Sequence, residues 1–188
     1  RGTPFLYYGE EIGMGCFRLP REAVRDPLGV KTWPLGSLGR DPERTPMQWD
    51  ATPGGGFGSE EPWLPMNPDW RERSVAAQRG RSSSLLEWYR ALIQLRRAMP
   101  ALRRGSLRWT PASREVLAFE RADEETGERV AVFLNFASRA GRAALSEDAV
   151  VLMGSARGAG QALAAGGCAL GPNESLIVRL KPLAEPRR

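Results

Sequence analysis

The sequence predicts an α/β segment followed by a small antiparallel β-sandwich. Three features support this prediction: an apolar run over residues 3–9, a helical hydrophobic pattern over residues 84–98, and a series of short β-rich segments after Gly105. With 188 residues and 41% hydrophobic content, the chain can bury a core in one or two small domains. We expect a first part over residues 1–104 and a sandwich over residues 105–188.

The run TPFLYYG at residues 3–9 has no polar alternation. This is typical of a parallel strand that is covered on both faces. Glu10 and Glu11 follow directly after Gly9. The carboxyl ends of such strands carry the active sites of α/β barrels, but acids at this place also cap the next turn or pair with arginines. Both interpretations of the two acids stay open.

Residues 40–50 read RDPERTPMQWD and fit no regular hydrophobic period. Pro42 and Pro46 disfavour a helix interior and a central strand. One interpretation is a structural loop whose polar groups are satisfied internally. The other is a binding loop that presents Arg40 and Asp41 to a hydroxyl group of a ligand.

The surrounding residues, 15–72, are rich in Gly, Pro and Trp. Trp33, Trp63 and Trp70 either anchor this long loop or offer faces on which sugar rings stack. The sequence GGGFG at 54–58 is not a phosphate loop, because no strand leads into it and no Lys follows it. Long structured loops of this kind are usually functional.

The clearest helix signal begins at Ser84. Ser84 and Glu87 have the spacing of a capping box, in which each side chain accepts from the other residue's backbone N–H. Apolar residues then recur at helical spacing until Pro100 stops the pattern. We expect an amphipathic helix over about 84–98.

After Gly105 the pattern changes to short β-rich segments. Strands are predicted over residues 107–110, 116–121, 129–136, 149–153 and 175–180. Turn signals at 125–127 and 171–173 separate them, and the Gly/Ala-rich residues 154–167 are predicted to form a loop. This arrangement is typical of an antiparallel sandwich.

Composition excludes several classes of function. The net charge is +5, with basic residues scattered rather than gathered into a stripe, so we expect no nucleic-acid partner. The chain has no His, and Cys16 and Cys168 lie far apart, so neither a zinc site nor a disulfide framework is expected. No metal, cofactor or membrane span is predicted. The low cysteine content favours a reducing, cytoplasmic compartment.

Several motifs together resemble one enzyme family. The stretch GTPFLYYGEEIGM at 2–14 is similar to the last barrel strand of the α-amylase family, glycoside hydrolase family 13. RDPERTPMQWD, then GGFG, EPWLPMNPDW and the helix SLLEWYRALIQLRR, resemble its α-glucosidase and oligo-1,6-glucosidase branch. The resemblance covers residues 2–105. Tyr8 departs from the Gln that many oligo-1,6-glucosidases carry, so linkage preference stays open.

The resemblance implies the C-terminal end of a (β/α)8 barrel, with its last strand, a long loop insertion and its last helix, followed by an antiparallel β-sandwich domain. It also implies a retaining glycosidase whose two catalytic carboxylates lie about 5–5.5 Å apart. In the family these carboxylates follow earlier strands, so no catalytic residue is assigned here. Arg40 is implied to contact the terminal glucose, and Asp41 to accept from the same sugar or hold Arg40.

The leading hypothesis is therefore the C-terminal part of an exo-acting α-glucosidase that acts on maltose- or isomaltose-type saccharides and is inactive as these residues alone. The chain opens at Arg1 without a Met, which favours a piece of a longer protein. One alternative is a glucosyl transferase or isomerase of the same family, of the sucrose or trehalose type. Another is a non-catalytic interaction protein on the same fold. Substrate, calcium binding and oligomeric state are not predicted.

Overall fold

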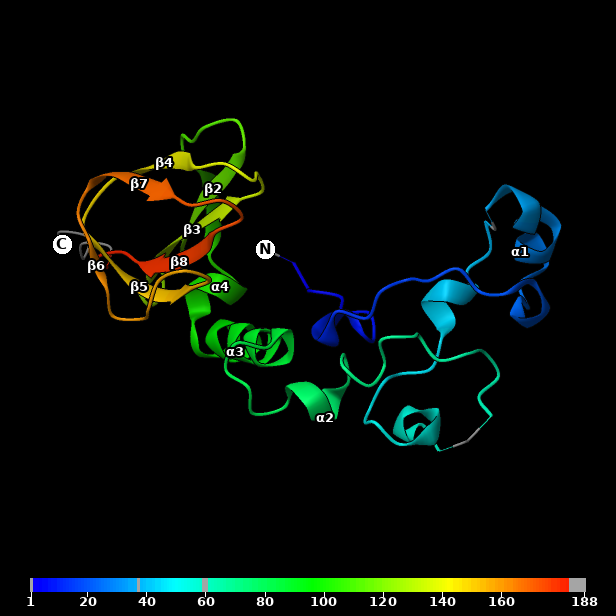
Figure 1. Ribbon diagram of the computed structural model, residues 1–188. Helices are drawn as coiled ribbons and strands as arrows, with labels where there is room; N and C mark the ends of the chain where they lie inside the picture. The colour runs from blue at the N-terminus through cyan, green and yellow to red at the C-terminus, as the bar shows by residue number, and fades with distance from the viewer. Residues whose placement is uncertain (1, 37, 59–60, 183–188) are drawn as a thin grey trace. The chain divides into compact units, whose positions relative to one another are not determined.

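The computed structural model describes residues 2–36, 38–58 and 61–182, which divide into two compact units (Figure 1). The first unit is Pro4–Ile93. The second contains residues 94–182 together with residues 2 and 3. The division falls inside helix α3 (Leu85–Ala98).

The first unit consists of short helical segments joined by irregular loops. These segments are η1 (Glu10–Ile12), η2 (Arg21–Ala23), α1 (Pro27–Thr32), η3 (Trp33–Leu35), η4 (Asp41–Arg44), η5 (Pro53–Gly56), α2 (Val75–Gln78) and the first part of α3. Its apolar side chains form two small buried clusters. One joins Ile12, Met47, Val75 and Leu86, and the other joins Leu19, Val24 and Leu64.

The expected strand over residues 3–9 is not formed, so this part of the prediction is wrong for the chain by itself. Residues 2–7 have no regular secondary structure, and Phe5 is 92% exposed. A strand is held by hydrogen bonds to a neighbouring strand. All strands among the described residues lie at or after Ser106, and none of them pairs with this run.

The predicted helix is confirmed as α3, which covers Leu85–Ala98. Half of the capping box is present, because Ser84 Oγ accepts the backbone N–H of Glu87 at 3.3 Å. The other half is redirected: Glu87 accepts from the N–H of Gly80 at 2.9 Å, while the N–H of Ser84 donates to the carbonyl of Arg81. Pro100 opens the short helix α4 (Pro100–Arg103) after α3 has ended. Across the described residues, no helix has the length and apolar character needed to cross a membrane.

The second unit is an antiparallel β structure with two sheets. The strands are β1 (Ser106–Trp109), β2 (Val116–Ala122), β3 (Arg129–Asn135), β4 (Gly141–Leu145), β5 (Ala149–Gly154), β6 (Ala162–Leu163), β7 (Gly166–Leu170) and β8 (Ser175–Arg179). Six strands pair in the order β1-β2-β3-β8-β5-β6, and β4 pairs with β7. A helical first part followed by an antiparallel sheet region is thus as predicted.

Strands β4 and β7 are not among the predicted strands, and β6 lies in the predicted loop of residues 154–167. Their sequences, GRAAL and GGCAL for β4 and β7, contain no β-branched or aromatic residue. Strand preference depends strongly on packing and pairing context. The two strands form because they pair with each other, from Gly141 opposite Leu170 to Leu145 opposite Gly166.

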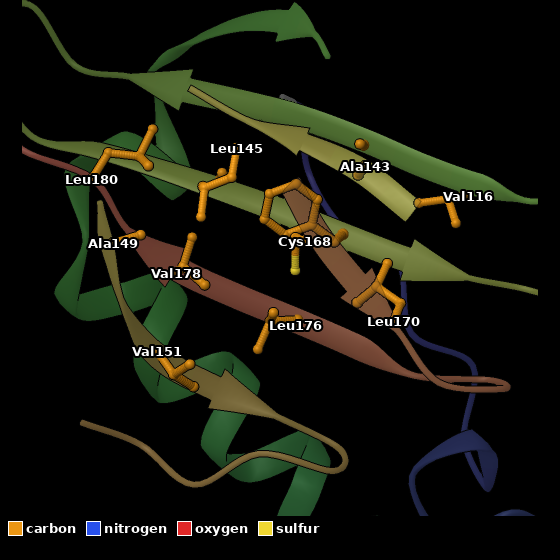
Figure 2. Close-up of a cluster of buried hydrophobic side chains, with 13 residues drawn as sticks. Val116, Ala143, Leu145, Ala149, Val151, Cys168, Leu170, Leu176, Val178 and Leu180 are labelled. Atoms are coloured by element: carbon orange, nitrogen blue, oxygen red, sulfur yellow. The ribbon is translucent and has the colours of Figure 1, made fainter. Parts of the chain in front are cut away.

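The core of the second unit is filled by side chains from both sheets (Figure 2). Phe133 on β3 and Leu176 on β8 are fully buried. Leu145 on β4 and Cys168 and Leu170 on β7 belong to the same cluster. Apolar burial is the main stabilising term in folding, so this cluster is the structural centre of the second unit.

Candidate functional site

The guanidinium of Arg40 is available for a ligand. Arg40 is exposed and lies just before η4. Its backbone N–H donates to the carboxylate of Asp26 at 3.3 Å. Within the described part of the chain, no hydrogen bond or ion pair involves its side chain. An arginine of this kind can donate to a ligand without first breaking a contact.

Asp41, in contrast, is buried, with 2% of its surface exposed. Its Oδ2 accepts the backbone N–H groups of Arg25 at 2.6 Å and Asp26 at 2.7 Å. Its Oδ1 has no hydrogen-bond partner among the described residues. Asp41 therefore ties the segment at 25–26 to η4, and its Oδ1 is the oxygen left to accept from another group.

Asp26 makes the return connection. Its Oδ1 caps α1 by accepting the N–H groups of Leu28 at 2.9 Å and Gly29 at 3.3 Å. Its Oδ2 accepts the N–H of Arg40 and lies 3.7 Å from Nη1 of Arg44. The N–H of Arg40, then that of Gly29, hold the pKa of Asp26 below its usual value, with smaller contributions from Leu28 and Arg44.

Two glycines permit this close approach. A Cβ on Gly39 would lie 2.7 Å from Cα of Gly29 and 3.0 Å from Cβ of Asp26. No side chain fits at that distance from a backbone atom, so the residue before Arg40 must be Gly for the loop to reach the start of α1.

Two tyrosines hold the other side of η4. The hydroxyls of Tyr7 and Tyr8 each lie 3.1 Å from the carbonyl oxygen of Glu43, and that of Tyr8 lies 2.9 Å from the carbonyl oxygen of Thr45. Burial raises the pKa of Tyr8 above its usual value, and the neighbouring Tyr7 adds to the rise. The end of the run at 3–9 is thus attached to the motif even though the run is not a strand.

The last part of the motif is anchored to the segment before α2. Gln48 is fully buried, and its Nε2 donates to the carbonyl of Arg73 at 2.9 Å. The carbonyls of Gln48 and Trp49 accept the N–H groups of Val75 and Ala76, each at 2.9 Å. Backbone and side-chain bonds therefore hold residues 41–49 from several directions, so the loop is a rigid platform.

A cavity of about 430 Å³ opens beside this platform. Its lining residues are Tyr8, Glu11, Arg44, Thr45, Pro46, Met47, Trp49, Phe57 and Trp63. Three of the aromatic rings are about half exposed: Trp49 at 47%, Phe57 at 54% and Trp63 at 56%. Neither Arg40 nor Asp41 lines it, and Asp41 borders a separate cavity of about 270 Å³. The structure therefore does not bring the two predicted residues together around one cavity.

Residues 1–105, more than half of the chain, match the family described as "Alpha amylase, catalytic domain". The chain belongs to the α-amylase family. A probable α-glucosidase of Rhizobium meliloti (strain 1021) is 40% identical over 122 residues, covering 65% of this chain and 22% of the relative. An oligo-1,6-glucosidase of Parageobacillus thermoglucosidasius is 37% identical over 115 residues, covering 52% and 20%. The resemblance to this branch is confirmed.

A solved structure extends the likeness to nearly the whole chain. The trehalulose synthase MutB from Pseudomonas mesoacidophila MX-45 matches with a TM-score of 0.80 and 30% identity, over 96% of this chain and 36% of MutB. Crystal structures of MutB mutants hold glucose or the substrate sucrose. The chain spans about a fifth of the length of the two curated relatives above.

In this α-amylase-family chain, the three tryptophans that the sequence left open between anchor and sugar-stacking face differ in their surroundings. Trp70 is buried, and the guanidinium of Arg71 lies 4.1 Å from its ring centroid. Trp33 is half-buried and donates to the carbonyl of Leu19 at 3.3 Å. Both are anchors, whereas the exposed ring of Trp63 borders the cavity.

Glu10 and Glu11, the two acids that follow Gly9, differ in their contacts. Glu11 accepts the backbone N–H of Gly9 at 2.8 Å, so for this residue the capping interpretation is confirmed. Glu10 is exposed. Among residues 2–36, 38–58 and 61–182, no three His, Cys, Asp or Glu side chains gather to hold a metal.

Two lining residues were not singled out from the sequence. Trp49 lies inside the RTPMQWD motif and Phe57 inside the Gly-rich turn. Each was therefore interpreted as part of its motif and not as a side chain that lines a cavity. In the folded chain both side chains line the cavity together with Trp63. The turn at residues 53–56 folds back onto the motif, and the carbonyl of Gly55 accepts the N–H of Trp49 at 2.8 Å.

Proposed function

We propose that these residues are the C-terminal part of a retaining, exo-acting α-glucosidase that hydrolyses maltose- or isomaltose-type saccharides. Residues 1–104 would complete the catalytic barrel, and residues 105–188 would form the sandwich that follows it. The match of residues 1–105 to the catalytic domain supports this division.

The observation that carries the proposal is the free guanidinium of Arg40 at the start of a rigid loop. A guanidinium presents several N–H donors in a planar fork, so it can bind two adjacent sugar hydroxyls, or a carboxylate that contacts them. Placed at the terminal glucose, it would favour cleavage at the chain end. Asp41 serves mainly to hold the loop through Oδ2. Its Oδ1 is buried and has no partner among the described residues, so it is the oxygen that would accept from a sugar hydroxyl.

Retaining glycosidases use one carboxylate as nucleophile and a second as general acid and base. We propose that both come from barrel residues outside this chain. The 188 residues alone are then inactive, and their contribution is to bind and orient the sugar. Because the sugar is held in one orientation, its glycosidic bond would lie between the two carboxylates for the chemical step.

The test is Arg40→Ala in the complete enzyme that carries these residues. Loss of a charge-assisted hydrogen bond lowers kcat/KM for maltose and isomaltose roughly 10- to 100-fold. Arg21→Ala, which removes another exposed arginine of the same unit, serves as the control and leaves the kinetics unchanged. Wild-type kinetics in the Arg40→Ala enzyme would remove Arg40 from the site.

A second candidate is a glucosyl transferase or isomerase, favoured by the match to a trehalulose synthase over 96% of the chain. Both reactions use the same barrel and differ in whether water or a second sugar receives the glucosyl group. Incubation with sucrose separates them. An α-glucosidase releases glucose and fructose, whereas an isomerase returns a disaccharide with a new linkage.

A further inference from the structure

The two carboxylate oxygens of Asp26 have different partners. Oδ1 accepts the N–H groups of Leu28 and Gly29, which open α1. Oδ2 accepts the N–H of Arg40 at 3.3 Å and lies 3.7 Å from Nη1 of Arg44. One oxygen therefore caps a helix of the loop, while the other reaches both ends of η4.

The connection is reinforced from the opposite side. Oδ2 of Asp41 accepts the N–H of Asp26 itself at 2.7 Å, and Gly39 packs against the backbone of Gly29. The segment around Asp26 and the segment around Asp41 thus fix each other. We call these two residues with their mutual contacts the Asp26–Asp41 lock. Arg40 lies between Gly39 and Asp41 in the sequence, so the lock holds the backbone on both sides of Arg40.

We propose that Asp26 is a positioning residue that fixes Arg40 in place for sugar binding. This inference rests on the proposed function, in which Arg40 binds the terminal glucose. Asp26 itself does not touch the sugar. Its Oδ2 binds the backbone N–H of Arg40 and so orients the backbone that carries the guanidinium. The same oxygen also pairs with the guanidinium of Arg44.

The consequence is energetic. An arginine side chain loses considerable rotamer freedom when it binds, and a mobile backbone beneath it adds to that loss. A backbone held in one conformation before binding reduces the loss. Without the contact from Oδ2, Arg40 still reaches the sugar but binds it more weakly, so the expected effect is smaller than that of deleting Arg40.

The decisive variant is Asp26→Asn in the complete enzyme. Asn is an equally good helix N-cap, so its amide oxygen can keep the contacts to Leu28 and Gly29. Its amide nitrogen then replaces Oδ2 and donates rather than accepts, which removes the contacts to Arg40 and Arg44. Asp26→Ser is the second variant, because Ser also caps a helix but has no second oxygen.

We expect Asp26→Asn and Asp26→Ser to raise KM for maltose about 3- to 10-fold, with little change in kcat. Asp148→Asn is the matched control, since Asp148 also accepts a backbone N–H, that of Ala165, but lies in the other unit. This control keeps wild-type KM. A wild-type far-UV circular dichroism spectrum and a cooperative unfolding transition establish that each variant is folded.

A double-mutant cycle tests whether Asp26 acts through Arg40. In an Arg40→Ala background, Asp26→Asn should have no further effect on KM, because the side chain that it positions is absent. Equal effects in both backgrounds would overturn the proposal, as would wild-type KM in both single variants. Failure of both variants to fold would also overturn it, by making Asp26 a residue of the fold alone.

These results are separate from the test of the proposed function. If Arg40→Ala has wild-type kinetics, the proposed function itself fails. If Arg40→Ala weakens binding but Asp26→Asn does not, the proposed function stands and only the positioning role of Asp26 is lost.

Discussion

Asp41 accepts the backbone N–H of Asp26 at 2.7 Å, and the carboxylate of Asp26 accepts the N–H of the residue that precedes Asp41. Two acids that are 15 residues apart in sequence thus each bind the backbone that carries the other. Because a backbone N–H left without an acceptor is costly, replacing either acid disturbs both segments. This reciprocal arrangement explains how a segment with two prolines and one short 3-10 helix can hold one conformation.

Gly39→Ala should loosen the lock without removing any hydrogen-bonding group. Its Cβ would lie 2.7 Å from Cα of Gly29, which is backbone and cannot rotate away. The loop must therefore shift, and in the complete enzyme we expect KM for maltose to rise about 3- to 10-fold, as for loss of one hydrogen bond. Gly158→Ala, where no atom lies within 4 Å of the new Cβ, is the control and should keep wild-type KM. Equal KM in both variants would show that the contact at Gly39 is not required.

Tyr8→Phe should destabilise the first unit more than Tyr7→Phe does. The Tyr8 hydroxyl lies near two carbonyl oxygens and that of Tyr7 near one, and Tyr8 is the less exposed, at 40% against 51%. We expect the free energy of unfolding to fall by about 0.5–1.5 kcal/mol for Tyr8→Phe, with a smaller loss for Tyr7→Phe. Urea unfolding followed by tryptophan fluorescence measures both. The reverse order would show that the contact to Thr45 contributes little.

The stability of the second unit should depend on pH through Asp123. The hydrogen bond from Arg104, with help from Thr126, lowers the pKa of Asp123 from its usual value of 3.8 to about 2. Because the folded-state pKa is below the unfolded one, the stabilisation is present above about pH 4 and is lost as the pH falls toward about 2. Asp123→Asn should be less stable at neutral pH and should show a flatter decline over that interval.

Asp148→Asn is the matched control for this pH experiment. Asp148 accepts the backbone N–H of Ala165 at 2.9 Å and has no ion pair to an arginine among the described residues. Its variant should keep the wild-type pH dependence, measured as urea midpoints by circular dichroism between pH 2 and pH 7. A decline in Asp123→Asn as steep as in the wild type would rule out the Arg104 pair as its source.

Two phenylalanines three residues apart provide a test of the sandwich core. Phe133 is fully buried in the cluster between the sheets, whereas Phe136 is 72% exposed. Phe133→Ala should lower the free energy of unfolding by about 3–5 kcal/mol, through lost burial and the cavity left behind. Phe136→Ala should change it by less than about 0.5 kcal/mol. Urea unfolding by circular dichroism measures both, and similar losses would place the core elsewhere.

Much of the architecture could be predicted because it follows from local patterns. The 3.6-residue period after Ser84 predicted α3, and the β-rich segment at residues 129–136 predicted β3. The motif at 40–50 pointed to the family, which the match over residues 1–105 confirms. In contrast, β4 and β7 have weak strand sequences and depend on each other, so their pairing could not be predicted from either one.

Like the fold, the candidate site could be predicted from the sequence only in part. By itself, the sequence determined that residues 40–50 form neither a long helix nor a central strand, because Pro42 and Pro46 disfavour both. It also determined that arginines and acids are the polar groups that this segment presents. Only the tertiary structure decided their contacts: the side chain of Arg40 has no partner among the described residues, Asp41 is buried against the backbone of Arg25 and Asp26, and Asp26 accepts the N–H of Arg40. The physical reason is that local patterns record backbone preference and burial. Which acid satisfies which distant N–H depends instead on how separate segments meet in space.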